Sequence, residues 1–294
     1  MTTGEEKKGK QKAVAYYDQE AEDYIKQYRE DYEEYPANLI RIKFIINRLR
    51  KNNVKTVLDA GCGTCGPMIK LLKKGFDTKG FDFSRDMIRQ GKEELKKAGY
   101  NSGLVCCADL ENGIGVPSEK FDAIIALGVF PHILDEKKAL LNIKEFLSPN
   151  GSVFIEFRNN LFAAYTLNKY SIDFFLNKII DLSSLPPEIQ NEVAGFYSKR
   201  LKADKPVRGS DGKLKYQDIL AKFQNPLSIS EEIFEPCGFS ITKIHFYHYH
   251  ALPPIFETKY PQLFRKLSLK MEKTDDWRGY LMASAFVVEA KTKD

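Results

Sequence analysis

The sequence lacks a hydrophobic run long enough to cross a bilayer, and its Lys- and Glu-rich N-terminus has no apolar signal core. We therefore expect a cytoplasmic protein with no membrane partner. The chain also has only a small excess of positive charge, since 45 Lys and Arg residues against 40 Asp and Glu residues give a formal net charge of +5. Nucleic-acid-binding domains are usually more strongly basic, so we expect no nucleic-acid partner.

Cysteine occurs five times, and an odd number in a chain of 294 residues does not indicate a disulfide framework. Cys62 and Cys65 form a C-x-x-C pair, a spacing that also occurs in redox and zinc sites. Both lie within a glycine-rich turn, so we interpret them as parts of that turn. The chain also lacks the G-x-S-x-G elbow of Ser/His/Asp hydrolases. What remains is a sequence with 43% hydrophobic residues, enough for a full core of one large α/β domain with an insertion, or of two modest domains.

The glycine-rich turn lies in the stretch 54–72, VKTVLDAGCGTCGPMIKLL, which predicts a buried strand, a tight turn and a helix that begins near Pro67. Gly61, Gly63 and Gly66 permit positive φ and let a ligand approach the backbone closely. The free N–H groups at the helix N-terminus would face that ligand. This arrangement predicts a nucleotide-type cofactor site.

Three aspartates lie at the ends of three predicted strands: Asp59 before the turn, Asp82 in the strand 78–83, and Asp109 after 104–108. The glycine spacing matches the dinucleotide fingerprint, so a nicotinamide cofactor and a dehydrogenase activity stay alternatives. Asp59 argues against them, because its charge would face a pyrophosphate, whereas the α-amino group of a sulfonium cofactor favours a carboxylate there. Asp82 suits ribose hydroxyls, and Asp109 suits an adenine amino group.

The glycine-rich turn and the three aspartates at the strand ends make the chain resemble the class I S-adenosylmethionine-dependent methyltransferases of the small-molecule type. The resemblance is good over residues 54–158 and looser over 227–290. The resemblance implies a Rossmann-like α/β fold, with a seven-stranded, mostly parallel sheet and helices on both faces. It implies S-adenosylmethionine as cofactor and S-adenosylhomocysteine as product. His248 and His250, two positions apart, could also ligate a metal, but no carboxylate or cysteine is obviously placed to complete such a site, so we expect no metal. The expected cofactor-binding residues are Asp59, Gly61, Cys62, Gly63, Asp82, Phe83, Met87, Asp109, Leu110 and Gly128.

The sequence pattern divides the chain into four segments. We expect an N-terminal tail and cap helix over 1–35, a cofactor-binding core over 36–160, a helical substrate lid over 161–226, and the rest of the core over 227–294. The lid segment includes a polar hairpin or loop near 209–215. Within the core we expect helices at 37–49, 67–74, 84–98 and 135–147, and further strands at 121–129, 152–157, 240–250 and 277–291.

Three histidines fall near the ends of predicted strands, where open parallel sheets bind their ligands. His132 follows the strand 121–129, and His248 and His250 end the strand 240–250. Methyl transfer is an in-line displacement that depends on holding the acceptor about 3–3.5 Å from the methyl carbon. A hydroxyl acceptor also needs a base, for which histidine is suited near neutrality. These three are the candidate catalytic residues, each with an ordinary structural histidine as the alternative.

The candidate substrate-binding residues come from the N-terminal segment and from the strand ends; they are Tyr16, Tyr17, Tyr24, Phe130, Arg158, Asn159 and Asn160. Some members of the family, the phosphobase N-methyltransferases among them, place a functional histidine after the fourth strand and pair it with an N-terminal tyrosine. The resemblance therefore assigns these roles to His132 and to Tyr16 or Tyr17.

We expect a methyltransferase that acts on a small-molecule substrate, at a hydroxyl of a sugar, nucleotide-sugar or similar polar metabolite, with histidine-assisted deprotonation. N-methylation of an amine or phosphobase is the main alternative, with cation–π contacts from the aromatic lid. The tRNA-modification alternative rests only on the mild basic charge. Outside enzymes, the alternative is an S-adenosylmethionine-binding module without turnover. No Asn/Asp-Pro-Pro-aromatic motif follows the strand 121–129, which argues against DNA methylation.

Overall fold

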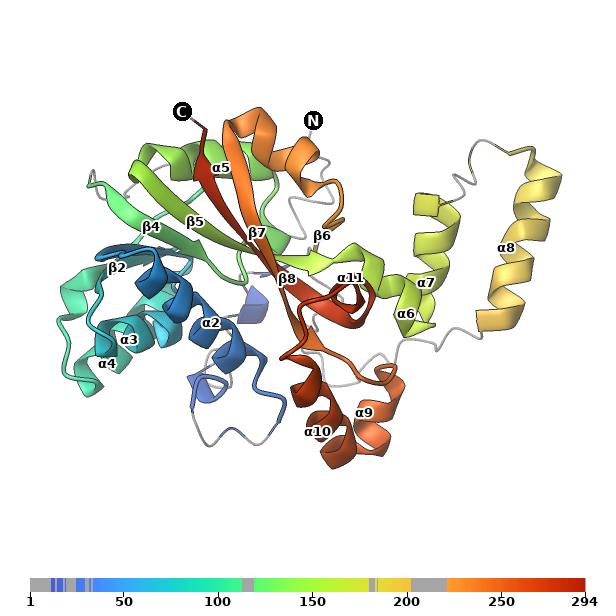
Figure 1. Ribbon diagram of the computed structural model, residues 1–294, viewed down its shortest axis with the longest axis horizontal. Coiled ribbons are helices and arrows are strands. Elements are labelled where there is room, and N and C mark those ends of the chain that lie inside the picture. The colour runs from blue at the N-terminus through green and yellow to red at the C-terminus, as the bar shows by residue number, and fades with distance from the viewer. Residues whose placement is uncertain are drawn as a thin grey trace.

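The computed structural model describes residues 12, 13, 15–17, 19, 25–29, 32, 34–112, 119–179, 183, 185–201 and 221–293. In this part of the chain a twisted mixed sheet has helices packed on both of its faces (Figure 1). No helix among these residues is both long enough and apolar enough to span a bilayer.

The sheet has the strand order β3-β2-β1-β4-β5-β8-β7, and the short β6 pairs with β5. Strands β1 to β5 run parallel, whereas β8 is antiparallel to both of its neighbours. The expected seven-stranded, mostly parallel Rossmann-like sheet is therefore confirmed, with β6 as an addition. The strands are β1 Thr56–Ala60, β2 Asp77–Asp82, β3 Val105–Cys107, β4 Phe121–Ala126, β5 Leu147–Asn159, β6 Phe223–Gln224, β7 Phe239–Tyr249 and β8 Ala283–Thr292.

The expected helices of the core form with shifts of one or two residues at their ends. Ser84 caps α4, because its side chain accepts a hydrogen bond from the Met87 N–H at 3.0 Å. The helices are α2 Ala37–Lys51, α3 Gly66–Lys73, α4 Arg85–Lys97, α5 Glu136–Glu145, α6 Ala163–Thr166, α7 Lys169–Phe174, α8 Pro187–Leu201, α9 Ile255–Lys259, α10 Pro261–Met271 and α11 Arg278–Met282.

Two hydrophobic clusters fix the helices to the sheet. On one face, Ile42 and Ile45 of α2 pack against strand residues such as Val57 and Phe154. On the other face, Leu140 of α5 packs with apolar residues of β1, β4 and β5. Because both faces of the central strands are buried, these strands are nearly continuous apolar runs, as parallel sheets require. The carboxyl edge of the sheet is left for ligands.

The single strand expected over 277–291 is wrong, because its first part forms α11. Asp276 accepts a hydrogen bond from the Arg278 N–H at 3.0 Å, which starts the helix. The Asn159 side chain then donates to the carbonyls of Tyr280 and Ala283, each at 2.8 Å. These bonds hold the helix against the end of β5, and β8 begins only at Ala283.

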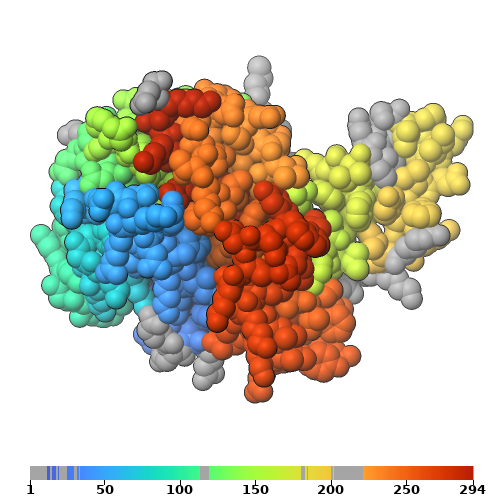
Figure 2. All heavy atoms as spheres, viewed as in Figure 1, coloured from blue at the N-terminus to red at the C-terminus, as the bar shows by residue number. Residues whose placement is uncertain are grey.

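The segment after β5 contains α6, α7 and α8, with α7 and α8 extending sideways from the sheet (Figures 1 and 2). Thr166, Asn168 and Ser171 tie α6 to α7 through a capping box and mutual side-chain hydrogen bonds. The hairpin or loop expected near 209–215 lies outside the described residues. The described part of the chain rejoins the sheet at β6, where Phe223 pairs with Arg158 of β5.

Candidate active site

The glycine turn between β1 and α3 is held open by its backbone. Gly61 has φ +85° and Gly63 has φ +51°, conformations that L side chains rarely adopt. A Cβ on Gly61 would lie 2.2 Å from Cγ2 of Val129, so a side chain has no room there. Cys65 precedes α3 with φ 66°, and α3 has Pro67 in its first turn. The turn therefore presents bare backbone at the carboxyl end of β1.

Asp59, the first of the three predicted aspartates, is completely buried beneath this turn. Neither of its carboxylate oxygens has a hydrogen-bond partner among the described residues. Burial, and then the charge of Asp82, raise its pKa to about 7. A buried carboxylate without a partner is costly, and an ammonium group would relieve that cost. Asp59 thus fits the α-amino group of the expected cofactor.

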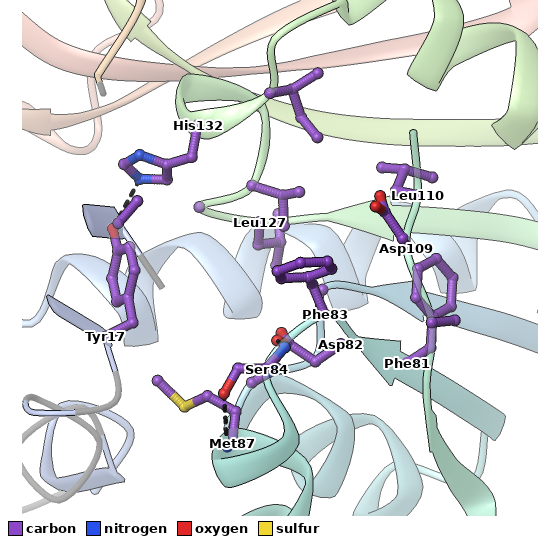
Figure 3. Close-up of a pocket in the computed structure, with 17 residues that line it drawn as sticks. Tyr17, Phe81, Asp82, Phe83, Ser84, Met87, Asp109, Leu110, Leu127 and His132 are labelled. Atoms are coloured by element: carbon purple, nitrogen blue, oxygen red, sulfur yellow. Dashed lines mark hydrogen bonds between the residues drawn. The ribbon is translucent and has the colours of Figure 1, made fainter. Parts of the chain in front are cut away.

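Asp82 and Asp109 lie at the ends of the next two strands and line one cavity (Figure 3). Asp82 accepts hydrogen bonds from the N–H groups of Gly63 at 2.9 Å and Ser84 at 2.8 Å. These bonds tie the glycine turn to the end of β2. Phe83, which is half exposed, adds an aromatic face to the cavity.

This cavity, here called the cofactor cavity, has a mainly apolar wall. It is lined by Ala13, Tyr17, Gly61, Gly63, Phe81, Asp82, Phe83, Ser84, Met87, Ala108, Asp109, Leu110, Leu127, Gly128, Val129, His132 and Ile133. Eight of the ten predicted cofactor-binding residues are in this set. The exceptions are Asp59, which is buried next to it, and Cys62.

Cys62 and Cys65 are free, buried thiols that pack inside the turn. Each thiol lies near the Gly63 carbonyl, at 3.9 and 4.0 Å, and a Cβ on Gly80 would lie 2.9 Å from that of Cys62. The C-x-x-C pair therefore packs the turn from within. No group of three or more His, Cys, Asp or Glu side chains in the described ranges is placed to hold a metal ion.

A second, more polar cavity adjoins the first and shares Tyr17 and Gly128 with it. We call it the polar cavity. It is lined by Tyr17, Gln27, Tyr32, Glu34, Tyr35, Ala37, Asn38, Arg41, Gly128, Glu156, Arg158, Tyr247, His248, His250 and Glu257. None of the residues that line either cavity comes from the described part of 161–226, so the substrate-lid role of that segment stays a prediction.

Tyr17 and His132 form a pair where the two cavities meet. The Tyr17 hydroxyl and the His132 Nε2 lie 2.8 Å apart (Figure 3). His132 is in the short 3-10 turn after β4, so the pair joins the N-terminal segment to the sheet edge. Tyr16 contacts the Tyr17 ring edge-on at 5.3 Å but does not line either cavity, and Tyr24 lies outside the described residues.

His248 and His250 lie together in the polar cavity, with their ring centroids 4.9 Å apart. His248 has φ 58° and stacks on Tyr35 at 5.0 Å. Burial lowers the pKa of His248 well below its ordinary value and that of His250 to about 4. Both imidazoles are therefore neutral at physiological pH and are weak bases there.

Besides Tyr16, three predicted substrate residues do not line the cavities. Phe130 is buried in the core, edge-on to Phe157 at 5.3 Å. Asn159 is 1% exposed and holds α11, as described above. Asn160 begins the 3-10 turn that leads into α6. Position after a strand end was the only sequence signal for these residues, and it does not fix where a side chain points.

Sequence reasoning missed the charged pair at the base of the polar cavity. Arg41 of α2 forms an ion pair with Glu156 of β5, and their side chains are 3% and 1% exposed. Both residues interrupt apolar runs, NLIRIKFII and SVFIEF, and a charge inside such a run was the available signal. Charged residues are almost never fully buried unless they are paired.

The fold agrees with the comparisons with known proteins. Residues 51–194 match a family model described as a methyltransferase domain. An S-adenosylmethionine-dependent methyltransferase from Clostridium acetobutylicum superposes with a TM-score of 0.55 at 14% identity, over 95% of this chain and 99% of that one. Magnesium protoporphyrin IX methyltransferase from Synechocystis with bound SAH superposes with a TM-score of 0.54 at 14% identity, over 97% of this chain and 100% of that one.

Sequence relatives match a shorter region. Glycine/sarcosine N-methyltransferase of Halorhodospira halochloris is 33% identical over 122 residues, which is 40% of this chain and 44% of that protein. Ubiquinone biosynthesis O-methyltransferase of Rickettsia prowazekii is 26% identical over 134 residues, 44% of this chain and 51% of that protein. The aligned region spans about half the length of these relatives. The chain carries a class I S-adenosylmethionine-dependent methyltransferase domain, as the sequence resemblance predicted.

Proposed function

We propose that this protein transfers a methyl group from S-adenosylmethionine to a small polar metabolite, at a hydroxyl oxygen. The observation that carries the proposal is the shared boundary of the two cavities at Tyr17 and Gly128. A cofactor in the apolar cavity and an acceptor in the polar one would meet at this boundary. Holding the two groups about 3–3.5 Å apart and in line supplies most of the acceleration that such a displacement needs.

The residues of the cofactor cavity suit an adenosyl sulfonium. Asp59 would pair with its ammonium group, Asp82 with its ribose, and Asp109 and Phe83 with its adenine. When bound, the cofactor supplies the electrophilic methyl group. The support is the buried Asp59 carboxylate, which has no hydrogen-bond partner among the described residues and which a pyrophosphate would meet with like charge.

His132 is the base that we assign to the hydroxyl proton. It lines the cofactor cavity and is hydrogen-bonded to Tyr17, which lines both cavities, so its ring is held next to their shared boundary. A general base works best with a pKa near the operating pH. His250, with a pKa of about 4, and His248 do not meet that requirement and would instead position the substrate as neutral hydrogen-bonding groups.

N-methylation of an amine or phosphobase is the second candidate. The polar cavity is also lined by Tyr32, Tyr35, Glu34 and Glu257, which are groups that bind cations through ring faces and carboxylates. The relatives include glycine/sarcosine N-methyltransferases as well as ubiquinone O-methyltransferases. In this case the amine would enter neutral or lose its proton before transfer.

The test is methyl transfer from labelled S-adenosylmethionine into a mixed extract of cellular metabolites, with the labelled product identified by mass spectrometry. We expect an O-methyl product. For that acceptor, His132→Gln should lower kcat about 10²–10⁴-fold while the affinity for S-adenosylhomocysteine is unchanged. An N-methyl product made at full rate by His132→Gln would favour the second candidate. Cofactor binding without any labelled product would contradict both and support a non-catalytic module.

A further inference from the structure

The inner part of the polar cavity contains more positive than negative charge. Arg41 and Arg158 both pair with the Glu156 carboxylate, and an Arg158 guanidinium nitrogen lies 4.0 Å from it; these are the ion pairs of the two arginines within the described residues. Burial alone would raise the pKa of Glu156, but the two guanidinium groups lower it below its ordinary value. Glu156 is therefore ionised, and the three side chains together carry one net positive charge.

The two arginines differ in what surrounds them. The Arg41 side chain is 3% exposed and binds Glu156, and it donates to the Tyr28 hydroxyl at 2.7 Å and to the Tyr247 hydroxyl at 3.4 Å. These contacts fix α2 and the N-terminal segment to the sheet. The Arg158 side chain is 27% exposed and lines the cavity. Arg158 is therefore the guanidinium that a ligand can reach.

The histidines of this cavity add hydrogen-bonding groups without adding charge. His250 is 6% exposed, lines the cavity, and neither of its ring nitrogens has a hydrogen-bond partner in the described part of the chain. A neutral imidazole offers one N–H donor and one acceptor nitrogen. A buried polar side chain of this kind is available to a ligand that supplies the partner.

The carboxylates Glu34 and Glu257 line the same cavity from other elements, the segment before α2 and α9. Burial, and then the charge of Glu34, raise the pKa of Glu257, so these two groups lie near each other. The cavity thus has a negative side at Glu34 and Glu257 and a positive side at Arg158. Glu156 also accepts a hydrogen bond from the Gly128 N–H, which places the positive side next to the boundary with the cofactor cavity.

We propose that the methyl acceptor carries an anionic group, a carboxylate or a phosphate, and that Arg158 binds this group with His250 as a neutral hydrogen-bonding partner. The inference rests on the proposed function and specifies its substrate class. Guanidinium groups bind carboxylate and phosphate with two parallel hydrogen bonds, a geometry that fixes orientation as well as affinity. Arg158 would then hold the acceptor's far end while its methylated atom faces Tyr17.

The experiment uses the full chain and the labelled metabolite assay described above. We expect the labelled product to contain a carboxylate or phosphate. With that acceptor purified, Arg158→Gln should raise KM about 10- to 100-fold with a much smaller change in kcat, because a charge-assisted hydrogen bond is lost. Arg158→Lys keeps the charge without the paired geometry and should give an intermediate KM.

Arg89→Gln is the matched control, because this arginine on α4 is 61% exposed and pairs only with surface acids among the described residues. The KM of the Arg89→Gln variant should equal that of the wild type. Unchanged S-adenosylhomocysteine affinity in Arg158→Gln would show that the variant is folded. A labelled product with no anionic group, or an unchanged KM in Arg158→Gln, would overturn the inference and leave the proposed function standing. Absence of any labelled product despite cofactor binding would instead overturn the proposed function.

Discussion

Removing the charge of Asp59 should stabilise the cofactor-free protein and weaken cofactor binding. Asp59 is completely buried, and its pKa is raised from 3.8 to about 7. Well below pH 3.8 the carboxyl is protonated in both the folded and the unfolded chain, so it contributes nothing to the pH dependence there. As the pH rises towards 7, the unfolded chain releases this proton first, and the folded state is destabilised by up to about 4 kcal/mol.

Asp59→Asn resembles the protonated form at every pH. Its free energy of unfolding should therefore exceed that of the wild type by up to about 4 kcal/mol near pH 7.5 and by little near pH 4. Urea unfolding at several pH values measures the difference. Asp77→Asn, at the exposed start of β2, is the control and should show no such pH dependence. A difference between Asp59→Asn and wild type that does not change with pH would refute the reasoning.

The same ionisation governs cofactor affinity, because only the carboxylate pairs with an ammonium group. With a pKa of about 7 in the free protein, the dissociation constant for S-adenosylhomocysteine should fall about eightfold between pH 6 and 7.5. Asp59→Asn should bind weakly and without this pH dependence. Isothermal titration calorimetry at the two pH values gives both quantities, and an Asp59→Asn variant that binds as the wild type does would contradict the assignment.

Two further substitutions test the turn and the end of β5. Gly61→Ala should abolish S-adenosylhomocysteine binding, because its Cβ would lie 2.2 Å from Cγ2 of Val129. Gly75→Ala is the control: this residue has a similar φ of +89° but open space around it, so the variant should lose only about 1 kcal/mol of stability in thermal unfolding. Asn159→Ala should lower the free energy of unfolding by about 2–4 kcal/mol, since it removes the donor from the carbonyls of Tyr280 in α11 and Ala283 at the start of β8. A lower turnover per folded molecule in Asn159→Ala would instead support the substrate-binding role that its sequence position suggested.

The cofactor half of the molecule was predictable because its signals are local. Glycines at fixed spacing and aspartates that follow apolar strands lie within about 50 residues of each other, from Asp59 to Asp109. Parallel strands then bring those residues to one edge without further information. The same rule placed His132 at the edge, where the structure pairs it with Tyr17.

The polar cavity was less predictable because it joins residues from distant parts of the chain. Arg41, Glu156 and Tyr247 come from a helix and two strands, and only the strand order and packing of α2 bring them together. Asn159 shows the converse limit. Its position at the end of a strand suggested a ligand contact, but α11 folds against its side chain, which donates to carbonyls at the end of that helix and therefore has a structural role.

The central claim is that the turn at Gly61 and Gly63, with Asp59 beneath it, holds the amino end of an adenosyl sulfonium. Calorimetric titration of the wild-type protein with S-adenosylhomocysteine and with NADH tests it most directly. The account predicts saturable binding of S-adenosylhomocysteine with one molecule per chain, and no binding of NADH. Saturable binding of NADH with none of S-adenosylhomocysteine would contradict it.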